Sequence, residues 1–184
     1  MKFTINQNHR KILLILIFVS LLALPSAFSE KLPPSFSANL GFNFFNYSEI
    51  YLDTGFAYNH PITDGLELTA GADFSLRTIK QTDGTVLPYF FIPINVGLNF
   101  IFQNTFPTYV LGVGLSPVIR IPPTAEDRGR FYMGPYIKAG IRIRVHRLMN
   151  WFVNVYQDLL IGEPAWINTS TRIYTGINFR FTPY

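Results

Sequence analysis

The residues of this sequence that could carry out chemistry are single charged side chains within segments of alternating polar and apolar residues. Three of them are predicted to meet. Counting across a turn centred near Ala165 places Asp158 opposite Arg172, and counting across a turn centred near Leu148 places Asp158 opposite Lys138. One acid would then lie between two cations. Ion pairing is the chemistry to expect here, because a buried charge needs a partner.

A second group of charges occupies the same polar face at another level. Glu67 is the obvious acid, and we expect it to neutralise the arginines that gather near it. These arginines are Arg142, Arg144 and Arg180.

A third group contains two acids, Asp53 and Asp73, with Arg77 as the cation expected to serve both. Paired charges favour an interior filled by side chains, and a narrow path for ions or small hydrophobic solutes is the alternative. The whole predicted network comprises Asp53, Glu67, Asp73, Arg77, Lys138, Arg142, Arg144, Asp158, Arg172 and Arg180.

Catalytic and metal sites have weak support in this sequence. Neither His60 nor His146 has a serine or an aspartate placed beside it by spacing, as nucleophilic catalysis would require. Two isolated histidines do not make a metal site, and the absence of cysteine excludes thiol chemistry and disulfides. We therefore predict no catalytic residue, no metal and no cofactor.

Eight alternating segments must position these side chains. Their lengths suit tilted strands, which need about 10 residues to cross a bilayer. An even series without helices predicts an all-β fold, an eight-stranded antiparallel up-and-down transmembrane β-barrel. The segments span residues 36–44, 50–59, 66–77, 86–100, 108–120, 131–145, 151–161 and 174–181.

The residue types on the two faces predict which face is inside. Every charge within the strands lies on the polar face, where a lipid-facing arginine or lysine would be costly. Aromatic residues on the apolar face collect near the strand ends, as in the girdles of membrane barrels. Glycine fits the crowded interior of a small barrel, and nine of the 13 glycines lie on the polar face: Gly41, Gly55, Gly71, Gly97, Gly112, Gly114, Gly134, Gly140 and Gly176.

The first 29 residues are predicted to be a cleaved signal peptide, leaving residues 30–184 as one barrel domain. A positive start, the apolar run 12–24 and the small residues Ala27 and Ser29 support this prediction. Removing Lys2, Arg10 and Lys11 lowers the net charge from +4 to about +1, so the charge does not indicate nucleic-acid binding. Charged residues make up only 14% of the chain, against about 25% in soluble domains, so a large apolar surface must face something other than water.

The last segment carries the sharpest family resemblance. Tyr174, Gly176, Phe179 and Phe181 have the order and spacing of a polar residue, a glycine and two hydrophobic residues. This order resembles the C-terminal β-signal of bacterial outer-membrane β-barrels, which their assembly machinery reads. The residues 182–184 that follow depart from the usual aromatic end.

Topology and this terminal signal, across residues 35–181, resemble the OmpX, OmpW and OmpA-barrel group. The resemblance implies a monomer in the bacterial outer membrane, with outer-membrane lipids and the barrel assembly machinery as partners and no nucleic acid. The turns at 60–65, 103–107 and 146–150 would be periplasmic. A structural, surface-interaction or minor transport role is expected, with an extracellular ligand that the sequence does not identify. An outer-leaflet lipid-modifying enzyme and a soluble secreted barrel compete with this interpretation.

Overall fold

A computed structural model of the chain describes residues 33–102, 105–123, 130–163 and 165–181. All regular structure in these residues is β-strand, and the predicted fold class is confirmed. No helix in the described segments is long and apolar enough to span a membrane. The eight strands are β1 (Ser35–Phe45), β2 (Glu49–Thr63), β3 (Leu66–Lys80), β4 (Val86–Phe102), β5 (Thr108–Ile121), β6 (Arg130–His146), β7 (Met149–Ile161) and β8 (Ile167–Arg180).

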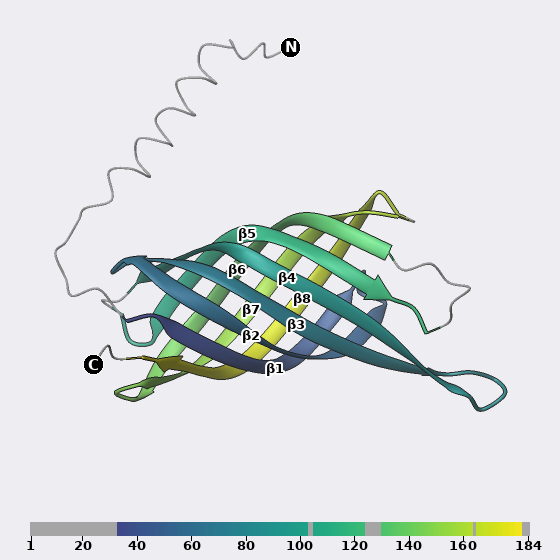
Figure 1. The fold of residues 1–184 in the computed structure, drawn as a ribbon, viewed down its shortest axis with the longest axis horizontal. Helices are drawn as coiled ribbons and strands as arrows, with labels where there is room; N and C mark the ends of the chain where they lie inside the picture. Colours follow the sequence, from purple (N-terminus) through teal and green to yellow (C-terminus); the bar gives the residue numbers. More distant parts are fainter. Residues whose placement is uncertain (1–32, 103–104, 124–129, 164, 182–184) are drawn as a thin grey trace, which may run out of the picture.

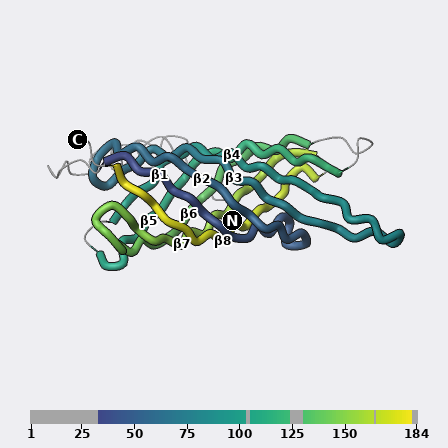
Figure 2. The backbone as a smooth tube through the Cα atoms, turned by 60° about the horizontal axis from the view of Figure 1, so that its bottom comes forward, coloured from purple at the N-terminus to yellow at the C-terminus, as the bar shows by residue number. Residues whose placement is uncertain are grey.

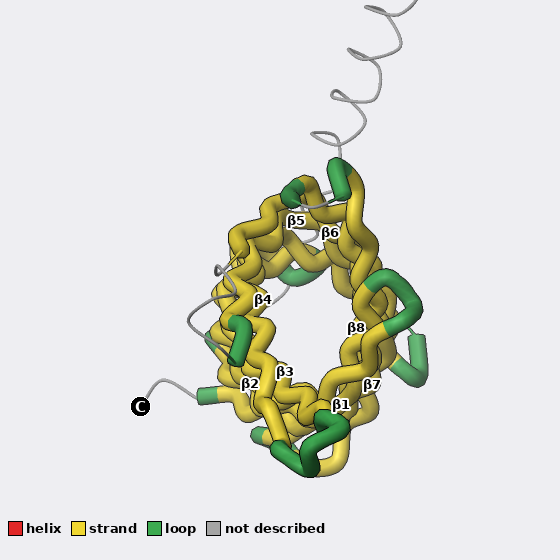
Figure 3. Tube along the Cα trace, turned by 90° about the vertical axis from the view of Figure 1, so that its right-hand side faces the viewer, coloured by secondary structure: helices red, strands yellow, loops and turns green. Residues whose placement is uncertain are grey.

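The strands form one closed antiparallel barrel in which each strand pairs with its neighbours in sequence and β1 pairs with β8 (Figure 1). The closing register places Phe36 opposite Phe179 and Phe44 opposite Thr171. Seen end-on, the strands make a complete ring (Figure 3). Closure leaves no strand edge with unpaired backbone groups, which a nonpolar surrounding would penalise strongly.

We call the barrel end where β1 begins and β8 ends the base, and the opposite end the mouth. The hairpin of β3 and β4 projects farthest at the mouth (Figures 1 and 2). Its turn contains Gly84 at φ 88°, and Asp83 accepts a hydrogen bond of 2.9 Å from the backbone N–H of Thr85. This bond lowers the pKa of the Asp83 carboxyl, because it stabilises the charged form.

Several predicted boundaries were wrong, because strands continue through residues that usually mark turns. β2 runs to Thr63 and therefore includes His60 and Pro61, where a turn was predicted. β8 begins at Ile167 and ends at Arg180, so Phe181 lies just outside it. The predicted signal peptide, the tail at 182–184 and most of the loop at 121–130 lie outside the described residues.

The apolar face points outward and the polar face points into the lumen, as the pattern of glycines and charges predicted. Leu40, Val113 and Ile137 are exposed on the outside, whereas Asn43, Asp53 and Asn99 are buried inside. This arrangement contradicts a soluble barrel with an apolar interior. Some glycines make room for the lumen: a Cβ at Gly112 would lie 2.7 Å from Asn99 Oδ1.

An apolar layer inside the lumen was not predicted. Toward the mouth, six buried side chains pack together: Phe45, Tyr51, Phe91, Val118, Tyr132 and Leu160. The rings of Phe45 and Phe91 are 5.1 Å apart, and those of Phe45 and Tyr132 are 5.6 Å apart. These residues lie on the face that elsewhere carries polar groups, so alternation alone could not identify a second hydrophobic cluster.

Candidate functional site

The candidate site is the lumen, and its centre is Arg172 of β8, a fully buried residue. Its Nε and Nη2 atoms donate to the two carboxylate oxygens of Asp158 at 2.9 and 2.7 Å. Its Nη1 donates to Asp73 Oδ2 at 3.0 Å and its Nη2 to Asn95 Oδ1 at 2.9 Å. Its guanidinium carbon also lies 4.8 Å from the ring centre of Tyr156. One side chain therefore connects β8 with β3, β4 and β7 across the lumen.

Asp73 is the most heavily bonded acid of this network. It accepts hydrogen bonds from Asn39 at 3.0 Å and from Asn95 at 2.8 Å, in addition to the bond from Arg172. The hydroxyl of Tyr174 lies 3.1 Å from Asp73 Oδ2 and 2.7 Å from Asp53 Oδ2. Tyr174 thereby joins the two acids, and within the described residues Asp53 has no cation at ion-pair distance.

The structure brings Asp158 and Arg172 together but keeps Lys138 away from Asp158. In the register, Lys138 faces Tyr156 and Asp158 faces Tyr136. The predicted centres of the β6–β7 and β7–β8 turns were each one residue too late in the chain. Each such error shifts the residue opposite a given position by two. Lys138 instead donates to Asn99 Oδ1 at 3.1 Å, and its ammonium lies 5.4 Å from the ring centre of Tyr156.

Nearer the base, Glu67 and Arg142 form a buried bidentate ion pair with N–O distances of 3.0 and 2.8 Å. Bidentate geometry is the strongest form of this pair. Arg144 is exposed and Arg180 is half-buried, and neither forms an ion pair with a described acid. The predicted gathering of three arginines at Glu67 therefore reduces to one direct pair.

Arg77 does not form an ion pair with Asp53 or Asp73, so the predicted pairing was wrong. Asp53 faces Ser75 in the register, so Arg77 lies one inward position closer to the mouth and binds Glu49 at 3.2 Å. Arg120 binds both oxygens of Glu49 at 3.1 Å, and Tyr51 donates to Glu49 at 2.6 Å. Sequence reasoning missed Glu49 and Arg120, because both were assigned to strand ends or loops.

The apolar layer around Phe45 and Phe91 lies between the Arg172 network and the ion pairs of Glu49 at the mouth. On β2, Tyr51 of the layer comes between Glu49 and Asp53. On β7, Leu160 lies nearer the mouth than Asp158. An ion that crossed the lumen would therefore meet a packed apolar layer and then a fully bonded arginine.

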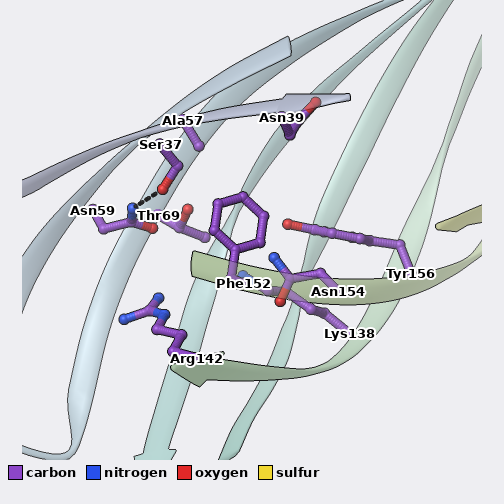
Figure 4. A pocket seen from close by; sticks show the side chains of 10 residues that line it. All are labelled: Ser37, Asn39, Ala57, Asn59, Thr69, Lys138, Arg142, Phe152, Asn154 and Tyr156. Atoms are coloured by element: carbon purple, nitrogen blue, oxygen red, sulfur yellow. Dashed lines mark hydrogen bonds between the residues drawn. The ribbon is translucent and has the colours of Figure 1, made fainter. Parts of the chain in front are cut away.

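A cavity of about 20 Å³ lies between the Arg172 network and the base. Figure 4 shows the side chains that line it. This volume suits about one water molecule. Its charged lining residues are Lys138 and Arg142, and Asn59 and Ser37 on its opposite wall are joined by a hydrogen bond of 3.0 Å.

The residues of the predicted β-signal divide between the two faces of the barrel. Tyr174 is buried in the lumen, whereas Phe179 and Phe181 are exposed on the outside. Gly176 faces Asn39 of β1 and Phe152 of β7, where a side chain would overlap the carbonyl oxygen of Ala38.

The described residues contain no cluster of three or more histidine, cysteine, aspartate or glutamate side chains that could hold a metal ion. His60 lies on the outside of β2, with its Nδ1 3.4 Å from the hydroxyl of Tyr58. His146 ends β6 and accepts a hydrogen bond of 3.4 Å from the backbone N–H of Leu148. Neither histidine is close to the lumen network.

The sequence matches no protein-family model and no curated protein. The structure is similar to Neisserial surface protein A (NspA), with a TM-score of 0.69 and 10% identity over 80% of this chain and 97% of that chain. It is also similar to Ail, the attachment invasion locus protein of Yersinia pestis, solved in complex with the heparin analogue sucrose octasulfate, with a TM-score of 0.56 and 10% identity over 82% and 99% of the two chains. A third similar structure is the outer membrane protein AlkL, with a TM-score of 0.50 and 12% identity over 87% and 96%. At these identities the likeness shows a common fold, the small eight-stranded barrel of outer-membrane proteins.

Proposed function

We propose that this chain is an integral, monomeric barrel of the bacterial outer membrane with a lumen closed to solutes, and that it has a structural or surface-interaction role. The observation that carries the proposal is Arg172, which is fully buried and joined to three other strands across the lumen. A conducting pore would need a path through this network and through the apolar layer above it.

The outer face supports the membrane part of the proposal. Large apolar side chains such as Leu111, Val113 and Leu115 are about half exposed along β5. Each Å² of apolar surface removed from water is worth about 25 cal/mol, so an outer face of this composition favours lipid over water. Outer-membrane lipids are accordingly the proposed surroundings, and the assembly machinery that reads the β-signal is the proposed partner in folding.

The mouth supports the surface-interaction role. Arg77 and Arg120 share the single acid Glu49, and Arg130 lies directly opposite Arg120 in the β5–β6 register. The group of Glu49, Arg77, Arg120 and Arg130 therefore contains more cations than acids, and an anionic extracellular ligand fits this group. The Ail structure, with its bound heparin analogue, shows that a barrel of this fold can bind a sulfated sugar.

Planar-bilayer recording of the refolded protein tests the closed lumen. The expected result is no steady conductance above that of the bare bilayer, whereas stepwise openings would favour a narrow channel. Arg172→Ala with Phe91→Ala removes the central arginine and one ring of the apolar layer. This variant is the positive control, because it should leak while the wild-type barrel does not. Mass spectrometry of lipid A from cells with and without the protein tests for a lipid-modifying activity, and we expect no mass change.

A further inference from the structure

Lys138 is the buried charge of the lumen whose neutralisation is incomplete. It is 5% exposed, and no acid lies within ion-pair distance of it among the described residues. An ammonium has three N–H donors, and its hydrogen bond to Asn99 Oδ1 uses one of them. The nearby ring of Tyr156, 5.4 Å away, supplies only weak cation–π attraction.

The neighbouring acids do not neutralise Lys138, because each of them is already paired with an arginine. Both carboxylate oxygens of Glu67 are held by Arg142 at 3.0 and 2.8 Å. Asp73 and Asp158 are held by Arg172 in the adjacent network. A buried charge without a counter-ion is strongly unfavourable in a medium of low dielectric constant.

Lys138 also lines the cavity of about 20 Å³. In Figure 4 the side chains of Lys138, Asn154 and Tyr156 enter from one wall, and those of Ser37, Asn59 and Thr69 line the other. Apart from the two cations, the polar groups of this lining are neutral amides and hydroxyls, and no carboxylate is among them. Amide N–H and hydroxyl groups can all donate to an anion.

We propose that this cavity is a binding site for one small monovalent anion, chloride in particular, held by Lys138 with Arg142 beside it. The ion supplies the missing negative charge and accepts hydrogen bonds from the ammonium N–H groups that Asn99 does not bind. A cavity of about 20 Å³, with room for about one water molecule, is closer in size to a halide than to sulfate or gluconate. The site is separate from any conduction through the lumen, because the Arg172 network and the apolar layer lie between it and the mouth.

The test measures stability of the refolded barrel in detergent micelles at neutral pH, in sodium chloride and in sodium gluconate of equal ionic strength. At a chloride concentration about ten times the dissociation constant, the folding equilibrium constant should rise about tenfold, following the mass action of a ligand that binds only the folded state. Lys138→Met, which keeps the length and removes the charge, should abolish the difference between the two salts. Arg144→Met, which removes an exposed cation outside the cavity, should leave it unchanged.

Crystals of the wild-type protein grown in sodium bromide give a second, independent measurement. An anomalous peak at hydrogen-bond distance from Lys138 Nζ supports the site even where Lys138→Met fails to fold. Equal stability in chloride and gluconate together with an empty or water-filled cavity in bromide would overturn the proposal and point to an uncharged lysine. A chloride effect that persists in Lys138→Met would also overturn it.

Discussion

The hydroxyl of Tyr174 contacts two acids inside the lumen and leads to a prediction about their charge states. A hydroxyl has one proton to donate, yet this one contacts Asp53 Oδ2 at 2.7 Å and Asp73 Oδ2 at 3.1 Å. An ionised carboxylate can only accept, so either the single Tyr174 proton is shared between both acids in a three-centre bond, or one acid is protonated and donates to the Tyr174 oxygen. Asp73 has Arg172 and two asparagine donors, whereas Asp53 has no cation among the described residues, so we predict that Asp53 holds the proton.

This assignment predicts different results for two similar substitutions. Asp53→Asn keeps the shape of a protonated acid and should change the free energy of unfolding by less than about 1 kcal/mol, as for a conserved hydrogen bond. Asp73→Asn removes a counter-ion of Arg172 and should cost about 3–5 kcal/mol, the usual range for breaking a buried pair. Urea unfolding in lipid vesicles, followed by tryptophan fluorescence, measures both. Equal losses in the two variants would contradict a proton on Asp53.

The ion pair of Asp158 with Arg172 leads to a second prediction. Asp158→Ala leaves two N–H groups of Arg172 without their acceptors, now bonded at 2.7 and 2.9 Å, and should destabilise the barrel by about 3–5 kcal/mol. Glu163→Ala is the matched control, because Glu163 is exposed in the connection between β7 and β8. Thermal unfolding compares the two, and the pairing is refuted when both variants unfold at the wild-type temperature.

β8 stabilises the barrel through both of its faces. Tyr174 and Arg172 point inward and complete the lumen network, while the outer residues Ile173 and Phe179 belong to the exposed apolar face. The same strand closes the ring against β1. If the assembly machinery reads this strand, changes in it affect stability as well as recognition.

A substitution at Gly176 can separate the effect of β8 on stability from its effect on recognition by the assembly machinery. A Cβ at this position would overlap the carbonyl oxygen of Ala38, so Gly176→Ala should force β1 and β8 apart. The expected cost is about 1–3 kcal/mol, as for overpacked sites in general. Gly65→Ala is the control, because the nearest atom to its Cβ would be 3.6 Å away. Refolding into detergent, where no assembly machinery is present, should be impaired for Gly176→Ala alone; normal refolding would assign this glycine to recognition only.

The strands and their inward faces could be predicted from sequence, but their exact pairing could not. Side chains along a strand alternate between the two faces with a period of two. An error of two residues in register therefore leaves every side chain on its predicted face but changes its partner. The pairing of Lys138 depends on the length of the β6–β7 turn, where the register shifts between Arg144 and His146. Nothing in the residue types of this turn indicated that shift. The same insensitivity explains why Arg77 was assigned to the wrong acids.

The lumen consists of several levels along the barrel axis, and only some of them could be predicted from the sequence. Charged residues within strands were found because any charge on a barrel strand needs an explanation. The apolar layer of Phe45, Phe91, Leu160 and their neighbours was missed, because an inward aromatic residue does not stand out in a chain with 16% aromatic residues. Glu49 was missed because β2 begins one residue before the predicted segment, and Arg120 was placed on the polar face of its predicted strand but was given no partner there.

The outward apolar face makes a prediction that distinguishes a membrane barrel from a soluble one. Val113 lies in the middle of β5, and Ile121 lies at its mouth end; both are exposed on the outside. In a bilayer, Val113→Arg places a charge near the midplane and should cost about 2–4 kcal/mol, whereas Ile121→Arg near the interface should cost about 0–1 kcal/mol. Reversible unfolding from lipid vesicles measures the difference between the two variants. In a protein surrounded by water, both arginines would replace exposed apolar surface and neither would be penalised by depth, so equal stabilities would argue against lipid as the surroundings of this face.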